Sequence, residues 1–396
     1  MKKYNENKGI TLIALVVSII VLLILAGISV SMLTGHNGIL NRASEAKEKT
    51  EIASKDEQRR LAQVEALMST VDTEYSGVTI PKGFAPTKIA GEDSIDVGLV
   101  ITDGSGNEYV WVEVPKTTEI YSTAGTNIMN FTDEEYAKIE KDLHEYTSDY
   151  RHSDYSDVNS DFLKQYQNML KSVYTNGGFW IGRYEAGISD GIPRTEHIDI
   201  RDSDKFVIKP NMIPYNYVTR DEAQELAKKM NYEDCTSSLI FGVQWDLMLK
   251  YIENKNNTVK EKLTVDSTFI GNYYNSEFIL NRGKFAQNNN FSNWYAFNSE
   301  EKVNLVMGNR KQKQSNENAS ILITTGATEA SNLQGIYDIA GNLGEWTLEF
   351  NLESSPCVYR GGSYNSQGSV GPAKCHNGRN IDNSNFGIGF RVGLWK

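Results

Sequence analysis

The sequence predicts an α+β protein, in which an N-terminal transmembrane helix precedes a globular body of irregular strands, turns and helices. Residues 10–33 form a run of 24 residues without one charged side chain. From about Thr79 onward, short alternating segments typical of strands are mixed with glycine-rich turns and capped helices. Apolar residues make up 39% of the 396 residues, which is enough for a packed core and argues against wholesale disorder.

Composition also excludes several classes of function. The chain has 40 Lys and Arg against 51 Asp and Glu, a net charge of −11, and no basic block that would bind nucleic acid. Its three cysteines are too few for a disulfide-built scaffold, and any pairing among Cys235, Cys357 and Cys375 stays open. The five histidines show no metal-binding spacing, so a histidine-rich metal centre is not expected.

The uncharged run of residues 10–33 is the strongest single signal. A helix of that length extends about 36 Å, enough to cross the roughly 30 Å hydrocarbon core of a bilayer. The alternative is a cleaved secretory signal peptide, whose apolar region is typically about 7–15 residues long with small residues after it. Here Ala26 and Gly27 lie inside the run, which favours a retained transmembrane helix.

The leader of residues 1–9, MKKYNENKG, resembles the type IV prepilin signal. In that family a peptidase cuts after the glycine, here between Gly9 and Ile10. The family's phenylalanine and glutamate at the first and fifth mature positions are replaced by Ile10 and Ala14. The resemblance therefore implies a minor subunit or a membrane anchor, with the membrane and other pilin-like subunits as partners. The positive leader places the bulk of the chain outside the cytoplasm, at a bacterial cell surface.

A charged stalk of residues 34–75 is predicted next. Residues 39–68 carry acidic side chains four positions before basic ones, an arrangement that stabilises a helix. Leu61, Val64 and Met68 fall on one face of this helix. We expect a solvated stalk, and a partner-binding helix is the alternative.

The globular body is predicted to span residues 76–396, with an acidic insertion at about 116–176. Thr132 begins a helix with a capping box inside this insertion, and a second helical stripe follows it. An exposed elaboration of the body is the expected role. Residues 285–319 are rich in Asn and Gln and short of aliphatic residues, so they are predicted to be loop.

Six short blocks follow one another in the body: FWIGRYEAG, YNYVTRDEAQELAKKM, FGVQWDLM, YDIAGNLGEW, RGGSY and GFRV. Together and in this order they resemble the formylglycine-generating-enzyme, or sulfatase-modifying-factor, domain. The resemblance covers roughly residues 100–396. It implies an irregular fold of the C-type lectin kind, with little regular secondary structure and many loops.

The reactive chemistry of that family does not carry over. The true enzymes bind copper through two cysteines shortly after the RGGSY-like block and oxidise a substrate cysteine to formylglycine. Counted without gaps, those positions are Ser366 and Gly371. A serine hydroxyl cannot replace a thiolate as a ligand for Cu(I). The resemblance therefore implies no copper and no catalytic cysteine pair, and Cys375 matches a structural cysteine of the family.

One calcium site of the family has counterparts here. Its ligands would be the side chains of Asp338 and Glu345 and the backbone carbonyls of Gly341 and Leu343. Ca²⁺ prefers carboxylate and carbonyl oxygens, and glycines allow the tight turn that presents them. The alternative is a capped turn whose carboxylates accept hydrogen bonds from backbone amides.

The segment between RGGSY and GFRV is rich in short polar side chains. Such side chains on a loop held between rigid blocks can bind many partners. The segment also resembles the variable region of proteins diversified by retroelements, and an ordinary Asn-rich surface loop is the alternative. The candidate ligand-binding residues are Asn365, Ser366, His376, Asn377, Arg379, Asn380, Asn383 and Asn385.

Three functions are compatible with these features. The first is a membrane- or pilus-anchored surface protein that displays a non-catalytic, lectin-like domain for adhesion or for binding an unknown extracellular ligand. The second is an enzyme of the resembled family that acts through a divergent site. That site would need a pocket formed by Arg360, Ser363, Tyr364, His376 and Arg379. The third is a retroelement-diversified receptor, which a near-copy of the final codons in the surrounding DNA would reveal.

Overall fold

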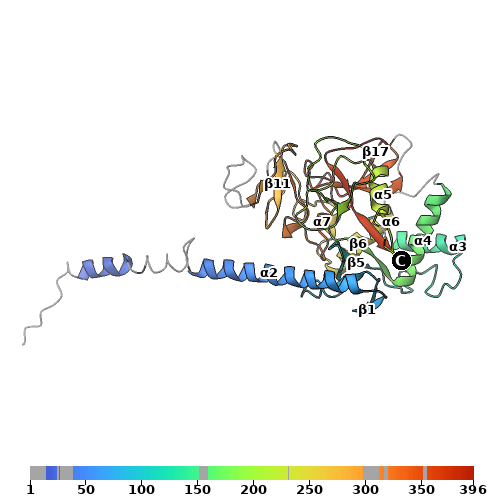
Figure 1. Cartoon of the computed structure of the whole chain (residues 1–396), viewed down its shortest axis with the longest axis horizontal. Coiled ribbons are helices and arrows are strands. Elements are labelled where there is room, and N and C mark those ends of the chain that lie inside the picture. The colour runs from blue at the N-terminus through green and yellow to red at the C-terminus, as the bar shows by residue number, and fades with distance from the viewer. Residues whose placement is uncertain are drawn as a thin grey trace, which may run out of the picture. The chain divides into compact units, whose positions relative to one another are not determined.

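The computed structural model describes residues 15–24, 26, 39–150, 159–230, 232–297, 312–315, 320–350 and 355–396. The chain divides into two compact units, Met1–Gln58 and Arg59–Lys396. The boundary between them falls inside helix α2 (Ile39–Met68), which covers the range predicted for the charged helix (Figure 1). The features that follow from β1 onward all belong to the second unit.

The prediction of an N-terminal transmembrane helix is wrong in the described structure. Residues 15–24 and 26 of the predicted segment are helical. Across the described ranges, every helix is too short or too polar to span a membrane. The rest of the predicted segment, and the predicted cleavage position between Gly9 and Ile10, lie outside the described residues.

The C-terminal end of α2 packs into the second unit through small residues. Ala62 and Ala66 are 3% and 1% exposed, while the guanidinium of Arg59 lies 3.1 Å from Glu92 Oε1 and 3.2 Å from Glu108 Oε1. The predicted apolar face of this helix is exposed to solvent at Leu61, Val64 and Met68. The C-terminal end of the helix is therefore held by alanine packing and ion pairs.

A six-stranded antiparallel sheet forms the centre of the second unit, in the order β3-β4-β5-β6-β19-β9. Its strands are β3 (Phe84–Pro86), β4 (Val100–Asp103), β5 (Glu108–Glu113), β6 (Gly178–Gly182), β9 (Thr236–Leu239) and β19 (Val392–Trp395). Trp111 and Trp180 face each other across β5 and β6, with ring centroids 5.0 Å apart. Almost every residue of these strands is buried, so the sheet carries residues on both faces into the core.

The insertion at 116–176 is not the exposed elaboration that its acidity suggests. It contains α3 (Asp133–Tyr146), capped by Thr132, and α4 (Ser160–Asn176), which packs against β6. Leu143, Met169 and Val173 are fully buried in the main core. The apolar stripe of each helix is stabilised by packing against other apolar residues. This packing determines where the helix lies, despite the charged residues on its opposite face.

The remaining helices are α5 (Arg220–Lys228), α6 (Gly242–Lys255) and α7 (Lys260–Thr264). Thr219 and Glu222 form a capping box at the start of α5, which lies against β9. Trp245 of α6 is fully buried and donates to Ala373 O at 3.0 Å.

A second sheet of four strands, in the order β17-β16-β15-β18, supports the C-terminal loops. Its strands are β15 (Gly344–Phe350), β16 (Cys357–Arg360), β17 (His376–Arg379) and β18 (Ile388–Phe390). Arg360 on β16 is completely buried, in ion pairs with Asp246 at 2.7 Å and Glu349 at 2.9 Å. The RGGSY block thus begins at the end of β16 and the GFRV block begins in β18, with β15 paired between these two strands.

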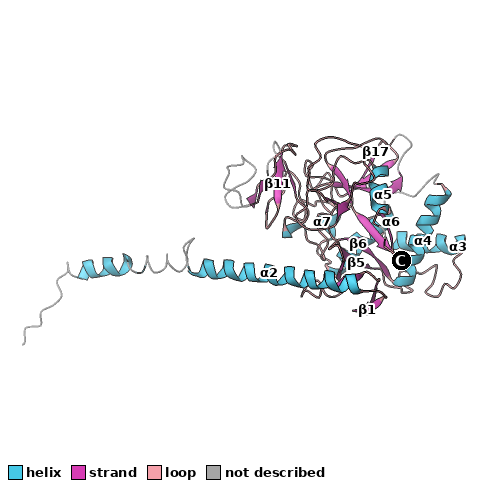
Figure 2. Ribbon diagram, viewed as in Figure 1, coloured by secondary structure: helices cyan, strands magenta, loops and turns pink. Residues whose placement is uncertain are grey.

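Short strands and loops make up the rest of the second unit, as Figure 2 shows. They are β1 (Thr73–Tyr75), β2 (Val78–Ile80), β7 (Gly187–Ile188), β8 (Phe206–Val207), β10 (Phe278–Ile279), β11 (Lys284–Gln287), β12 (Tyr295–Ala296), β13 (Gln312–Lys313), β14 (Ile321–Ile323) and η1 (Glu329–Ser331). The segment 285–319, predicted to be loop, contributes strands to two of these small sheets. Phe285 and Tyr295 give those strands the apolar contacts that the Asn-rich composition conceals.

Candidate functional site

The two positions that correspond to the reactive cysteines of the resembled family lie side by side. A Cβ atom built on Gly371 would stand 3.3 Å from Ser366 Oγ. The turns between them are closed by hydrogen bonds from Ser366 N to Ser363 O and from Gly371 N to Gln367 O, both 3.0 Å. The backbone therefore brings the two positions together as a thiol pair would need, but they carry one hydroxyl and one hydrogen.

The nearest thiol to this pair is chemically quiet. Cys375 Sγ lies 3.9 Å from the Cβ position of Gly371, and Asn377 Nδ2 donates to it at 3.5 Å. Burial raises the pKa of the Cys375 thiol to about 11. A single protonated thiol is a weak nucleophile and a poor ligand for Cu(I).

The predicted calcium loop is a tight turn between η1 and β15. Asp338, Gly341 and Asn342 all have left-handed backbone, with φ of +61°, +69° and +54°. A side chain at Gly341 would collide with the Asn272 carbonyl oxygen at 2.2 Å, so only glycine fits there. The turn places the side chains of Asp338 and Glu345 in the protein interior.

Protein donors already engage both carboxylates predicted as calcium ligands. Asp338 accepts hydrogen bonds from Gly326 N at 2.6 Å and Ser331 Oγ at 2.7 Å. Both oxygens of Glu345 accept from the guanidinium of Arg391, at 2.7 to 3.2 Å. As arranged, these oxygens fit the capped turn, which is the alternative to calcium. Calcium binding through these two side chains and the carbonyls of Gly341 and Leu343 stays a prediction.

Sequence reasoning missed a third acid beside this turn. Glu185 is completely buried and accepts from Leu343 N at 2.9 Å and Asn342 Nδ2 at 2.7 Å. Burial, together with the nearby carboxylates of Asp338 and Glu345, raises the pKa of Glu185 well above its usual range. No local spacing connects Glu185 to a turn more than 150 residues later, so only the fold reveals this contact.

The candidate ligand-binding residues divide into two groups. Asn365 and Asn385 converge on Gly387, since both Oδ1 atoms lie 3.5 Å from the Cβ position of that glycine. The second group comprises His376, Asn377 and Arg379, which lie on the edge strand β17.

In the second group, Arg379 stacks on Tyr359 with 5.1 Å to the ring centroid and donates to its hydroxyl at 3.1 Å. Burial lowers the pKa of His376. Asn380 and Asn383 close the turn that follows β17, where Asn383 N donates to Asn380 O. Arg360 is completely buried, so it cannot join Arg379 in the solvent-facing pocket that a divergent enzyme would need.

The first group is linked through Asn385 to a region with half-buried aromatic rings. Tyr217, Trp294 and Phe386 pack against the apolar cluster that contains Tyr364. Tyr217 contacts the first group directly, because its backbone N donates to Asn385 O at 3.1 Å. The rings of Tyr364 and Phe386 lie 6.4 Å apart.

Asparagine side chains lie beside these rings with their oxygens fixed. The Oδ1 atoms of Asn289, Asn365 and Asn385 accept hydrogen bonds from the Tyr364 hydroxyl, Ser363 Oγ and Gly387 N, respectively. Among the described residues, no acceptor engages their Nδ2 groups. These donors and the three rings form what we call the aromatic–amide face, which consists of Tyr217, Asn289, Trp294, Asn365, Asn385 and Phe386. Sequence reasoning missed its residues 217, 289 and 294, although the Asn-rich composition of 285–319 pointed to that segment.

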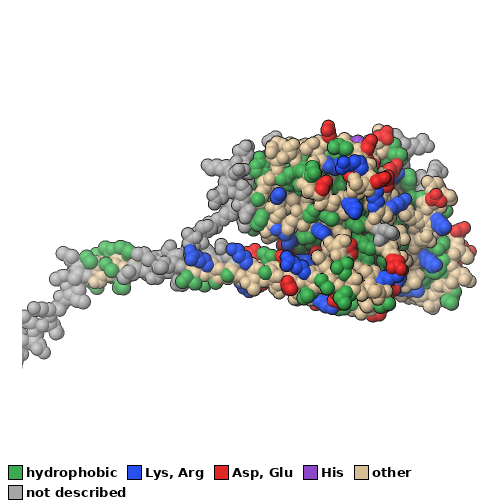
Figure 3. All heavy atoms as spheres, viewed as in Figure 1, with side chains coloured by type: hydrophobic (Ala, Val, Ile, Leu, Met, Phe, Trp, Pro, Cys, Tyr) green, Lys and Arg blue, Asp and Glu red, His purple; other side chains and the backbone are tan. Residues whose placement is uncertain are grey.

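Charged side chains do not dominate the visible surface of the second unit. In the view of Figure 3, Lys and Arg side chains are intermixed with Asp and Glu side chains over that unit. The surface visible in this view therefore has no broad patch of one charge sign that could bind a ligand. Ligand binding on this surface would depend on hydrogen bonds and ring contacts.

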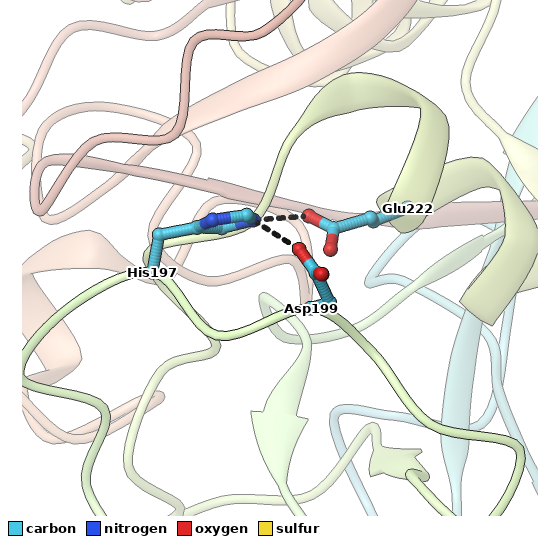
Figure 4. Close-up of side chains that lie close together, drawn as sticks. All are labelled: His197, Asp199 and Glu222. Atoms are coloured by element: carbon cyan, nitrogen blue, oxygen red, sulfur yellow. Dashed lines mark hydrogen bonds and ion pairs between the residues drawn. The ribbon is translucent and has the colours of Figure 1, made fainter.

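A separate cluster joins a loop to the start of α5. His197 Nε2 lies 3.1 Å from Glu222 Oε2 and 4.0 Å from Asp199 Oδ1, and Figure 4 shows the imidazole edge turned toward both carboxylates. Sequence reasoning missed this cluster because it searched for spacings between histidines, whereas these residues pair one histidine with acids from two segments.

Comparison with known proteins gives little beyond fold. No family model matches the chain, and no curated protein matches it. A solved structure described as the crystal structure of CarF is similar over 55% of this chain and 87% of its own length, with 11% identity and a TM-score of 0.33. Treponema denticola variable protein 1 is similar over 77% and 89%, with 13% identity and a TM-score of 0.22. Both similarities are weak and concern the fold alone.

Proposed function

We propose that the chain is a non-catalytic ligand-binding protein whose binding surface is the aromatic–amide face. The observation that carries this proposal is a set of three carboxamides whose oxygens are held by the protein, one of them by Tyr364, together with three half-buried rings that pack against the apolar cluster of Tyr364. An amide whose oxygen is held by the protein presents its NH₂ group in a defined direction, without loss of side-chain entropy on binding.

The chemistry of the face favours a saccharide. Amide NH₂ groups donate to hydroxyl oxygens, and aromatic rings cover the apolar C–H face of a pyranose. Tyr217 adds a phenol, and the ring of Phe386 is fixed by its contact with Tyr364. A neutral oligosaccharide therefore matches the face better than a strongly charged ligand.

The absence of the thiol pair supports a binding role over the chemistry of the resembled family. Ser366 Oγ donates to Ser363 O at 2.8 Å, so this hydroxyl stabilises its own turn. Cys375 stays protonated because burial raises its pKa. Display of the binding face at a cell surface, alone or with pilin-like subunits, stays a prediction of the sequence.

Binding of the full chain to an array of immobilised neutral oligosaccharides tests the proposal. We expect at least one class of glycan to be bound, and Asn365→Ala and Phe386→Ala to lower the affinity about tenfold each, since each removes a donor or a ring worth about 1.4 kcal/mol. Asn257→Ala removes an exposed carboxamide outside the face and outside the candidate ligand-binding residues, and it should leave binding unchanged.

Two outcomes would contradict the proposal. One is an array that stays blank for the folded wild-type protein. The other is turnover of a sulfatase-type cysteine peptide by the same preparation, which would show chemistry that the side chains at Ser366 and Gly371 do not explain.

A further inference from the structure

The cluster of His197, Asp199 and Glu222 lies apart from the residues of the aromatic–amide face and combines one nitrogen donor with two carboxylates. Its three ligand atoms lie within 4.8 Å of one another. Neighbouring ligands around Zn²⁺ stand about 3–3.5 Å apart when metal–ligand bonds are about 2.0–2.2 Å. The separation of 3.1 Å between His197 Nε2 and Glu222 Oε2 lies in that range, and the separation of 4.0 Å between His197 Nε2 and Asp199 Oδ1 exceeds it.

We propose that this cluster binds a divalent transition-metal ion of the Zn²⁺ class through His197 Nε2 and one carboxylate oxygen each of Asp199 and Glu222. Imidazole and carboxylate ligands suit Zn²⁺, and three protein ligands leave a position for water. To bind the ion, the neutral imidazole offers the Nε2 lone pair and keeps its proton on Nδ1.

The protein fixes one ligand of this site before any ion arrives. Glu222 Oε2 accepts from Thr219 N at 2.9 Å and Thr219 Oγ1 at 3.0 Å, and Oε1 accepts from Ile200 N at 3.1 Å. The carboxylate is therefore held by the capping box of α5 and by the loop that carries the other two ligands. Such outer contacts orient a ligand and raise the affinity of a metal site.

The other two ligands can adjust. The side chains of His197 and Asp199 are 34% and 96% exposed, and in the described structure Asp199 contacts only the imidazole through a charged group. A rotation of Asp199 toward His197 closes the 4.0 Å gap without moving a buried atom. The exposed position also gives an ion a direct path from solvent.

An ion at this site would act on the loop that supports Tyr217. The Ile198 carbonyl, between two of the ligands, accepts from Arg194, which also donates to Tyr217 O at 3.2 Å and Tyr215 Oη at 3.1 Å. Metal binding would clamp this loop to α5 and reduce its freedom. The stabilisation follows from mass action, since the ion binds the folded chain.

The test is a titration of the metal-stripped full chain with Co²⁺, followed by displacement with Zn²⁺. We expect one equivalent of Co²⁺ to give visible absorption that Zn²⁺ abolishes, and excess Zn²⁺ to raise the melting temperature. His197→Gln and Asp199→Asn should each weaken binding at least tenfold. Asp202→Asn removes an exposed charge from the same loop outside the cluster, so it should change the affinity less than twofold.

Melting curves without metal check that each variant folds, and the Asp199 variant, whose side chain is 96% exposed, keeps the test valid if the His197 variant is destabilised. Equal Co²⁺ affinity in the wild type and in both ligand variants would overturn the proposal. A wild-type chain that binds neither Co²⁺ nor Zn²⁺ at 1 mM metal would do the same. Neither result bears on the aromatic–amide face, which is tested by glycan binding.

Discussion

The replacement of two thiols by Ser366 and Gly371 changes the chemistry of the loop while its backbone geometry remains. The Cβ position of Gly371 still faces the Ser366 side chain. Counting along the sequence from the RGGSY block located both positions because they are separated by only five residues. The acid beside the neighbouring turn, Glu185, could not be found in this way, since its partners Asn342 and Leu343 lie in a different part of the chain.

The double variant Ser366→Cys/Gly371→Cys should form a disulfide. The 3.3 Å separation between the Cβ of position 371 and the γ atom of position 366 is close to that of a disulfide, in which each Cβ lies about 3 Å from the far sulfur. Thiol titration in denaturant should count three free thiols after mild oxidation and five after reduction, because the chain already has three cysteines.

Each single variant is the control for this pair and should keep four free thiols after the same oxidation. The side chain at 371 also approaches Gly362 Cα at 3.1 Å, so a small local shift accompanies the substitution. Five free thiols in the oxidised double variant would show that the two positions do not meet in solution.

At the scale of elements, sequence patterns located the helices better than they located burial. Thr132 caps α3 as predicted, because the N-cap is a local signal, and the structure shows its side chain accepting from Glu135 N. The burial of α3 and α4 was not predicted, since a charged face gives no information about what covers the opposite face. The strands of 284–296 were missed because they are short and their partners are distant in sequence.

The pairing of β10 with β13 buries a lysine whose titration affects stability. Lys313 is 0% exposed and donates to Ser276 O at 2.7 Å and Tyr274 O at 3.1 Å. Burial lowers the pKa of Lys313 to about 7. Between that pH and the ordinary lysine pKa near 10, the unfolded chain binds more protons than the folded chain, so the free energy of unfolding rises with pH.

We expect this lysine to add about 2 kcal/mol to the free energy of unfolding between pH 7 and pH 9.5, less than the full shift implies because two carbonyls stabilise the ammonium. Urea denaturation at several pH values measures the effect. Lys313→Met should remove this rise, while Lys284→Met, at an exposed lysine of β11, should retain it. A slope that survives Lys313→Met would exclude this lysine as its source.

At the scale of the whole molecule, the border between the two compact units lies within one continuous helix. The sequence predicts the helix. It does not predict where the residues of α2 change from exposed to buried, because burial depends on tertiary contacts. Arg59 is the first residue of the second unit, and it forms ion pairs within that unit, with Glu92 and Glu108. The prediction of a transmembrane segment is wrong at this same scale, since within the described ranges no helix is long and apolar enough to cross a bilayer.

Truncation tests where the second unit begins. A chain of residues 59–396 should unfold with the same urea midpoint as the full chain, because it keeps Arg59, Ala62 and Ala66. A chain of residues 69–396 should have a free energy of unfolding about 3 kcal/mol lower than the full chain. This truncation exposes the surface that the alanines cover. It also leaves Glu92 and Glu108 with Arg183 as their remaining ion-pair partner in the described structure. Arg59→Met in the full chain should reproduce part of this loss, and equal midpoints for both truncated chains would contradict the assignment.

The position of β19 between β6 and β9 has a consequence for biosynthesis. Until that strand leaves the ribosome, the central sheet is split, and two strand edges with their amide and carbonyl groups are open to pairing with other nascent chains. Polypeptides that terminate before Val392 cannot close this gap. Chaperones that shield strand edges during translation are therefore the cellular factors on which the yield of native protein should depend most.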